Sequence, residues 1–410
     1  MYRILDLTDE KGLLCGRILA DLGLDVIKIE KPGGDDCRNI GPFWKDIHHA
    51  EKSLFWFSYN LNKKGITLDI MKRRGQSLFK QLVERADAII ESFPPSYLSE
   101  LGLDYDSLAR GKPNLVMTSI THYGKSGPYK DRKSSDLVAN AVGGYVYITG
   151  PADRPPVRIS KVDQAYCHAG SHAAVGTLIA LICRNRLGLG QHVDISIEES
   201  VVWTLMYVQQ YWDLTGYIYP RSGVFAHRTN LNVRQYWPCK DGYVGWRIFL
   251  GSSGGSFGGE GVKRMVEAMG EEGMAQGLDM VHWEASGMDD VTQEDITFWE
   301  ERFASFFLTH TKRELNNIAE RKGIPLFPIS TPADLIDNVQ LNSRHYWVDI
   351  EHPELSDTII YPGPFVLCDP PLGELRRRAP LVGEHNSEIY EQELGISPQE
   401  MTDLKEEGVI

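Results

Sequence analysis

Two groups of residues in this chain have types and spacings that could support catalysis, and the first is a glycine- and serine-rich run. Gly251–Gly259 reads GSSGGSFGG and contains the pattern G-x-S-x-G twice, centred on Ser253 and Ser256. It lies between a predicted strand and a predicted helix, which is the setting of a serine nucleophile elbow. Overlapping matches arise easily in such a run, so we interpret it as a loop. A serine hydrolase is kept as an alternative.

The second group is a pair of histidines, His168 and His172, one turn apart on a predicted helix. This spacing can hold a metal ion. No third Cys, His or carboxylate ligand stands nearby, and two ligands rarely retain a metal. We therefore predict that the histidines pack on the helix surface, and we predict no metal site.

Nucleotide chemistry of the common kinds lacks its signatures, and the charge is unevenly spread. There is no G-x-G-x-x-G after the first strand and no G-x-x-x-x-G-K-[ST]. The net charge of −13 argues against binding of nucleic acid or an anionic membrane. Residues 1–80 nevertheless hold 14 Lys and Arg against 11 Asp and Glu. This basic end suits a small polyanionic ligand, although ordinary surface scatter would give the same count. We expect at least one of Lys63 and Lys64 to be a solvated surface charge.

Cysteine usage and hydropathy indicate a cytoplasmic chain. The six cysteines stand far apart with no C-x-x-C pair, which is typical of reduced thiols. No run of eighteen apolar residues suggests a membrane span. The start, MYRILDLTDEKG, shows no basic-then-apolar leader.

Strands and helices alternate over the first 200 residues, which predicts an α/β fold with a largely parallel sheet and helices on both faces. Ligands of such sheets bind at the carboxyl ends of the strands. The predicted helices are Gly12–Leu22, Gln76–Arg85 and Ala165–Ile182. The predicted strands are Tyr2–Leu7, Asp25–Glu30, Gly65–Ile70, Ala88–Phe93, Leu115–Thr121 and His192–Ile197.

The regular alternation of strands and helices ends after residue 220, which predicts a large domain over 1–220 and a smaller α+β domain over 221–330. The small domain should contain a strand at Gly242–Leu250 and helices at Gly261–Met269 and Asp295–Thr309. We expect residues 331–410 to be irregular and to complete the large domain. Two short helical pieces, Ser387–Glu393 and Ser397–Glu407, should end the chain.

Seven segments, in order over nearly the whole chain, resemble those of the family III (CaiB/BaiF-type) CoA-transferases. The resemblance implies a Rossmann-like large domain, a small domain, and two subunits threaded through one another as interlocked rings. The segments are Leu19–Arg38, Asn60–Ile70, Ala86–Tyr105, Ser126–Gly144, Arg184–Ile197, Lys322–Ile329 and Arg378–Ile389.

The resemblance also implies a site for coenzyme A over the N-terminal sheet, with CoA and its thioesters as substrates and no permanently bound cofactor. Cations and helix N-termini suit the phosphates, and an apolar slot suits the adenine. Two family contacts are lost, because Met71 replaces an expected lysine and Glu100 an expected arginine. The implied CoA-binding residues are Lys31, Leu68, Met71, Lys72, Ser92 and Phe93.

Catalysis in this family depends on one aspartate. Its carboxylate attacks the donor thioester, which gives a mixed anhydride and then an aspartyl-CoA thioester that the acceptor acid consumes. By resemblance the aspartate stands about twenty-two residues before Gly188, at Tyr166 in this chain. The nearest acid, Asp163, is three residues too early. A phenol with an ordinary pKa near 10 does not readily form this intermediate. We favour Tyr166 at the nucleophile position and keep Asp163 as the alternative.

Two further family features are missing. The glycine-rich loop that should precede Tyr236 is replaced by FAHRTNLNVRQ at Phe225–Gln235. The His-Asp pair of the related α-methylacyl-CoA racemases reads Ser135-Asp136, which disfavours racemase activity.

The sequence therefore favours a non-catalytic subunit of a CoA-transferase. The resemblance implies an acyl-CoA donor such as succinyl-CoA, a carboxylic acid acceptor such as benzylsuccinate, and a paralogous catalytic subunit in an interlocked dimer or heterotetramer. This pattern is typical of anaerobic aromatic degradation. Two alternatives stay open. One is a self-sufficient transferase with Asp163 as the nucleophile, and the other is a CoA-ester-binding scaffold without transfer activity.

Overall fold

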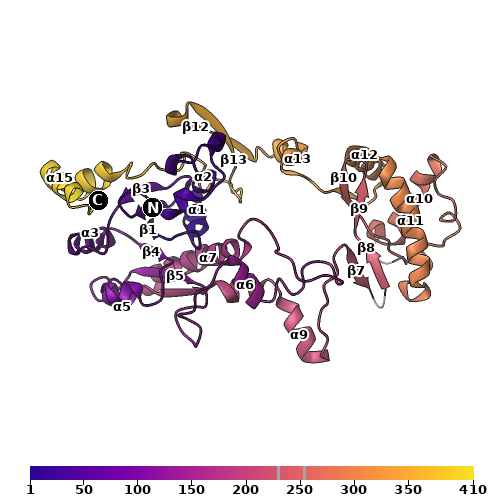
Figure 1. Cartoon of the computed structure of the whole chain (residues 1–410), viewed down its shortest axis with the longest axis horizontal. Helices are drawn as coiled ribbons and strands as arrows, with labels where there is room; N and C mark the ends of the chain where they lie inside the picture. The colour runs from indigo at the N-terminus through magenta and orange to yellow at the C-terminus, as the bar shows by residue number, and fades with distance from the viewer. Residues whose placement is uncertain (229–230, 253–254) are drawn as a thin grey trace. The chain divides into compact units, whose positions relative to one another are not determined.

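The chain folds into two compact units in the computed structural model (Figure 1). The large unit comprises residues 1–146, 158–218 and 339–410, and the small unit comprises 147–157 and 219–338. The small unit is thus built from two stretches of chain, whereas the sequence suggested one at 221–330. The structure describes residues 1–228, 231–252 and 255–410.

The large unit is built on a six-stranded parallel sheet with the order β3-β2-β1-β4-β5-β6. This is the doubly wound order of Rossmann folds, and it confirms the predicted α/β class. The order reverses between β1 and β4, so the carboxyl ends of these two strands flank a crevice where such sheets bind ligands. The strands are β1 (Arg3–Leu7), β2 (Asp25–Glu30), β3 (Lys64–Thr67), β4 (Ala88–Glu91), β5 (Val116–Thr121) and β6 (His192–Ser196).

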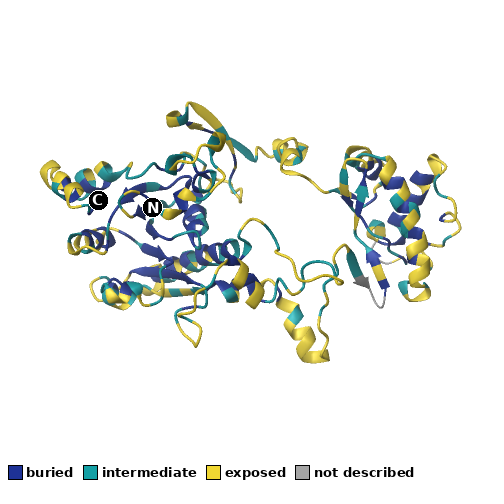
Figure 2. Cartoon of the chain, viewed as in Figure 1, coloured by how far each residue is buried: buried dark blue, intermediate teal, exposed yellow. Residues whose placement is uncertain are grey.

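Side chains alternate across this sheet into two cores. The strands of the sheet are drawn mostly as buried residues (Figure 2). Ile4 packs with α1 (Leu13–Asp21) and α7 (Gln164–Leu187), whereas its neighbour Leu5 packs with α3 (Arg73–Glu84) and α15 (Pro398–Glu406). Both faces being covered explains why apolar residues stand at consecutive positions in these strands, as in Ile4-Leu5 and Ile89-Ile90. The other helices of this unit are α2 (Leu54–Asn60), α4 (Tyr97–Glu100), α5 (Tyr105–Ala109), α6 (Asp136–Val142), α8 (Ile197–Trp203), α9 (Met206–Thr215), α14 (Val339–Ser343) and the π-helix Ser387–Glu393.

Helix α7 is the longest helix that the structure describes and is rich in small residues. Gly170 lets α1 approach closely, because a Cβ there would lie 3.0 Å from the Cβ of Leu14. By length and composition alone α7 could cross a membrane. Ten of its 24 residues, the first Ala165 and the last Arg184, are instead buried in the large unit.

The small unit holds a three-stranded antiparallel sheet and an aromatic core. The core includes Trp237, Trp246 and Phe303, with the rings of Trp246 and Phe303 4.6 Å apart. The strands of the small unit are β7 (Phe225–Arg228) and β8 (Leu231–Arg234), which pair with each other, and β9 (Tyr236–Cys239), β10 (Gly242–Gly245) and β11 (Phe327–Pro328), which form the three-stranded sheet. Its helices are α10 (Gly259–Glu271), α11 (Gln293–Thr309), α12 (Lys312–Lys322) and α13 (Pro332–Ile336).

Four expectations about secondary structure were wrong, and one of them is the strand expected over Gly65–Ile70, which ends at Thr67. Residues 331–410 are not simply irregular, because β12 (Trp347–His352) and β13 (Asp357–Pro362) pair as a hairpin. The alternation in WVDIEH and DTIIYP carried this signal. The strand expected to reach Leu250 ends at Gly245, and the one expected to reach Phe93 ends at Glu91. Ser92 and Phe93 therefore lie in the loop that leaves the sheet, at the crevice.

Candidate functional site

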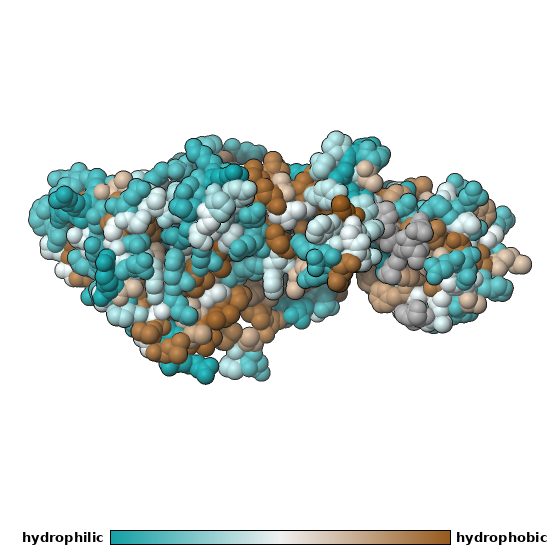
Figure 3. Space-filling view, turned by 90° about the horizontal axis from the view of Figure 1, so that it is seen from below, coloured by the Kyte–Doolittle hydropathy of each residue, from teal (hydrophilic) through white to brown (hydrophobic). Residues whose placement is uncertain are grey.

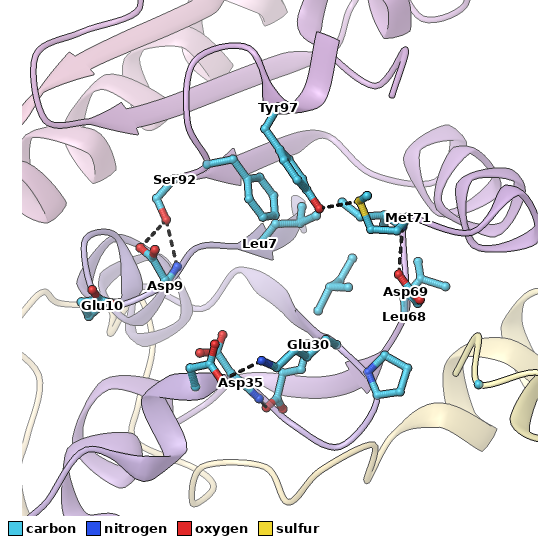
Figure 4. A pocket seen from close by; sticks show the side chains of 17 residues that line it. Leu7, Asp9, Glu10, Glu30, Asp35, Leu68, Asp69, Met71, Ser92 and Tyr97 are labelled. Atoms are coloured by element: carbon cyan, nitrogen blue, oxygen red, sulfur yellow. Dashed lines mark hydrogen bonds and ion pairs between the residues drawn. The ribbon is translucent and has the colours of Figure 1, made fainter. Parts of the chain in front are cut away.

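A cavity of about 790 Å³, here called the sheet-edge pocket, opens at the carboxyl ends of β1, β2 and β4 (Figure 4). Five of the six residues that the sequence singled out for CoA meet there. They reach the pocket from different loops because parallel strands end at the same edge of the sheet. The five are Lys31, Leu68, Met71, Ser92 and Phe93.

The sixth residue, Lys72, lies outside this lining. Its ammonium group donates to the backbone carbonyls of Glu407 and Gly408, the latter at 2.9 Å. Gly408 itself lines the pocket. Lys72 therefore anchors the end of the chain beside the pocket rather than facing a ligand in it.

Specific contacts hold the rim of the pocket in place. Figure 4 shows Ser92 pointing toward Asp9 and Tyr97 pointing toward Met71. The Ser92 hydroxyl donates to Asp9 Oδ1 at 2.7 Å and accepts from the Asp9 amide at 2.9 Å. Phe93 stacks on Tyr97 with ring centroids 4.6 Å apart, and the Tyr97 hydroxyl lies 3.0 Å from Met71 Sδ. Together they form an apolar, aromatic wall.

The charge of the sheet-edge pocket is acidic, not basic. Lys31 is its single cationic lining residue, and its ammonium group is 2.6 Å from Asp36 in an ion pair exposed to solvent. Burial, reinforced by the charge of Asp9, raises the pKa of Glu10. The carboxylate residues of the lining are Asp9, Glu10, Glu30, Asp35, Asp36 and Asp69.

Buried cations beneath the pocket explain part of this imbalance. Arg38 forms a bidentate ion pair with Glu30, at 2.6 and 2.7 Å, and both side chains are buried. Lys28, also buried, lies 3.2 Å from Asp35. Burial opposes ionisation of Asp35, but the Lys28 charge and the hydrogen bonds with Cys37 and Lys28 together outweigh it, and the pKa of Asp35 is lowered.

A third buried cation, Lys63, lies 2.8 Å from Asp6, and both side chains are 0% exposed. Lys64 is mostly buried too, in ion pairs with Asp25 at 3.2 Å and Glu388 at 2.9 Å. The expectation that one of these two lysines is a solvated surface charge was therefore wrong. The excess of cations in residues 1–80 is largely used inside the fold.

A second cavity of about 580 Å³, the basic pocket, shares Ser92 and Phe93 with the sheet-edge pocket. Its lining carries four cations and one carboxylate, Asp131. The sequence analysis missed this cluster, although the run Lys130-Asp131-Arg132-Lys133 is visible in the sequence. The cations are Lys11, Lys130, Arg132 and Lys133.

Tyr166, at the expected nucleophile position, lies behind the basic pocket. It is 8% exposed, and its hydroxyl is 3.2 Å from Nε2 of His122, which lines that pocket. Burial and then the Glu10 carboxylate raise the pKa of Tyr166. Burial and then the Lys11 charge lower the pKa of His122 to about 4. Both side chains are therefore neutral near pH 7, and a neutral phenol is a poor nucleophile toward a thioester.

Asp163, the alternative nucleophile, stands at the N-cap position of α7. Its carboxylate is 3.1 Å from the guanidinium of Arg158. Neither Asp163 nor Tyr166 is among the residues that line the two pockets. An attacking carboxylate must be unpaired, so Asp163 would have to leave Arg158 before it could react.

The structure describes three of the other sequence candidates, Ser256, His168 and His172. Ser256 lies in a short 3-10 helix, Gly255–Phe257, and Ser253 lies outside the described residues. The rings of His168 and His172 lie near those of Tyr145 and Trp203. Within residues 1–228, 231–252 and 255–410, no group of three or more His, Cys, Asp or Glu could hold a metal ion.

Comparison with known proteins gives a consistent result. The model of CoA-transferase family III matches residues 2–386. The chain is 33% identical over 409 residues to the succinyl-CoA:(R)-benzylsuccinate CoA-transferase subunit BbsE of Thauera aromatica, covering 100% of this chain and 97% of that protein. It is 31% identical over 400 residues to the succinyl-CoA–D-citramalate CoA-transferase of Chloroflexus aurantiacus, covering 97% and 94%.

A solved structure agrees. A CAIB/BAIF family protein from Brucella suis superimposes with a TM-score of 0.79 at 27% identity, covering 95% of this chain and 98% of that one. At 95% coverage of this chain, the match includes residues of both compact units. CoA thioesters are the substrates of the matched transferases, as their names state. The chain therefore belongs to the CoA-transferase family III.

Proposed function

We propose that this chain is the non-catalytic subunit of a heteromeric CoA-transferase that moves CoA from succinyl-CoA to an acid such as benzylsuccinate. The observation that carries the proposal is Tyr166, a buried neutral phenol where the family needs a reactive carboxylate. The ion pair of Asp163 with Arg158 adds to it. The 33% identical relative is itself named as a subunit of a benzylsuccinate enzyme. A paralogous partner subunit would supply the nucleophilic aspartate.

CoA would lie across the two adjoining pockets of the large unit. Its phosphates carry several negative charges and would face Lys130, Arg132 and Lys133, because the carboxylates of the sheet-edge pocket repel them. The apolar wall around Met71 and Phe93 suits the adenine ring or the pantetheine arm. Lys31 would add a weaker contact, since it is exposed and already paired.

Exposed apolar side chains on three helices of the large unit support assembly with a second subunit. Large hydrophobic side chains gather on α7, α8 and α9, and Figure 3 shows brown hydrophobic side chains gathered over parts of the surface. Monomeric proteins rarely expose large apolar patches of this kind. Examples are Ile179 and Ile182 of α7, Trp203 of α8, and Met206, Tyr207 and Trp212 of α9, all at least half exposed.

The proposal is tested by assaying the chain alone and after co-expression with its paralogous partner. The chain alone should transfer no CoA from succinyl-CoA to benzylsuccinate and should form no hydroxylamine-sensitive adduct. The co-expressed complex should be active. A CoA-sized adduct mapped to Asp163 would instead establish the self-sufficient enzyme. CoA binding without activity in either sample would favour the scaffold.

The interlocked arrangement of the two subunits gives a second, independent test. Subunits that pass through one another cannot dock after each has folded, so mixing separately folded subunits should restore little activity. Co-expression should restore all of it. Rapid recovery on mixing native subunits would overturn the interlocked arrangement while leaving the assignment of activity untouched.

A further inference from the structure

A cavity of about 350 Å³ lies entirely within the small unit, and we call it the aromatic pocket. It is formed by the β9–β10–β11 sheet, the segment that follows β10, and the start of α10. Its volume is at the lower end of small-molecule sites, large enough for a compact organic acid and too small for CoA. Nothing in the chemistry described above uses it.

The floor of the aromatic pocket is buried and its rim is not. Trp246 and Val262 are 4% and 2% exposed. At the rim Tyr236, Phe257 and Phe327 are 46%, 61% and 60% exposed. Large aromatic side chains left open around a concave site offer faces on which a flat apolar group can stack.

Among the described residues that line this pocket, one side chain, Arg247, is charged, and none is a carboxylate. The Arg247 guanidinium lies 4.0 Å above the ring of Phe249, another lining residue, and this contact places the cation at the pocket wall. A guanidinium stacks through its face, while its N–H donors lie in its plane, in the fork geometry that matches a carboxylate. The sheet-edge pocket, with six carboxylates, has the opposite preference.

We propose that the aromatic pocket binds the acceptor acid, with Arg247 pairing with a carboxylate and the aromatic rim holding an aryl or similarly bulky apolar group. This assignment rests on the proposed function, since it names where this chain recognises the acid. The ligand class is an aryl-substituted carboxylic acid. A small acid without the apolar group, such as succinate, would gain the ion pair alone and bind weakly.

Gly245 of β10 keeps this pocket open. A Cβ at this position would lie 3.7 Å from the Phe327 carbonyl oxygen, 3.8 Å from Ile329 Cδ1 and 3.9 Å from Tyr236 Cε1. These are ordinary contact distances, so a side chain fits here without displacing the backbone, and it would project among pocket-lining residues. Gly245→Leu therefore fills the pocket, and Gly245→Ala fills it slightly.

The test titrates the co-expressed complex with benzylsuccinate and with succinate by calorimetry, and also measures KM for both substrates. Gly245→Leu and Arg247→Met should each weaken benzylsuccinate binding at least tenfold and raise its KM equally. The KM for succinyl-CoA and the melting temperature should stay unchanged. Arg302→Met is the matched control, because Arg302 also stacks on a phenylalanine of the small unit, Phe298 at 3.3 Å, outside this pocket.

The outcomes separate this inference from the proposed function. Transfer to benzylsuccinate with unchanged KM in Gly245→Leu and Arg247→Met overturns the pocket assignment and leaves the function standing. A complex that transfers no CoA, but whose affinity for benzylsuccinate falls in both variants, supports the pocket assignment and overturns the proposed function. If Gly245→Leu lowers the melting temperature, Gly245→Ala replaces it in the test. A small rise in the KM for benzylsuccinate then supports the pocket assignment, and an unchanged KM overturns it. Equal affinity for succinate and benzylsuccinate also overturns the inference.

Discussion

The sheet-edge pocket and the basic pocket share Ser92 and Phe93 yet carry opposite charges. One has six carboxylates and the exposed ion pair of Lys31. The other has four cations and one carboxylate. The cations of the sheet-edge region lie beneath its surface, where Lys28, Arg38 and Lys63 neutralise buried acids. The net charge of a sequence segment therefore says little about the electrostatic potential in the pocket above that segment.

The sharpest test of this contrast breaks a buried pair. Lys63→Met would leave Asp6 charged, buried and without its cation, which should destabilise the fold by about 3–5 kcal/mol. Chemical denaturation measures this loss. Lys31→Met is the control, because its ammonium group is 58% exposed and its loss should scarcely change the midpoint. Equal midpoints for Lys63→Met and the native chain would contradict the structural role of the buried cation.

Reversing the charge of the basic pocket should have the next largest effect. Arg132→Glu combined with Lys133→Glu should weaken CoA binding about thirtyfold, or about 2 kcal/mol, at low salt. The difference should shrink at higher salt, because both side chains are exposed and screened. Titration calorimetry at two salt concentrations measures it, with Arg73→Glu, an exposed cation outside both pockets, as the control. An unchanged dissociation constant would place the phosphates elsewhere.

The pH dependence of stability tests the interior wall of the basic pocket. His122 has a pKa of about 4 when folded and an ordinary value of 6.5 when unfolded. Between these values the unfolded chain binds a proton that the folded chain does not, so this contribution to stability falls as the pH falls from 6.5 toward 4. Because His122 is partly exposed, we expect a loss of about 1 kcal/mol between pH 7 and 5 that His122→Gln abolishes. Parallel pH profiles would argue against this burial effect.

The smallest effect should come from Lys31, the residue that the sequence placed first at the nucleotide. Lys31→Ala should weaken CoA binding about two- to threefold, because the exposed pair with Asp36 already satisfies its charge. Lys80→Ala, an exposed cation of α3 outside both pockets, provides the baseline. If Lys31→Ala weakens CoA binding more than the double reversal at Arg132 and Lys133 does, the phosphates of CoA lie at the sheet-edge pocket rather than at the basic pocket.

The positions of the predicted residues show how far the sequence could predict the site. Five of the six residues that the resemblance implied do line one pocket, because they follow the carboxyl ends of parallel strands, although the sequence extended two of those strands too far. The sequence could not place Lys72 outside the lining, since its partners, the carbonyls of Glu407 and Gly408, are more than 300 residues away in the chain. The hairpin β12–β13 was missed, although its alternation was present, because surrounding prolines suggested a loop.

The sequence by itself determined the parallel sheet, its flanking helices and the family, since strand and helix periodicity and ordered motifs are local properties. It also fixed that a tyrosine stands three residues after Asp163. Only the tertiary structure decided that this tyrosine meets His122, which follows β5, that Asp163 meets Arg158, and which cations are buried. Burial and pairing depend on residues distant in the chain, and these contacts govern whether a charge is neutralised or presented to a ligand.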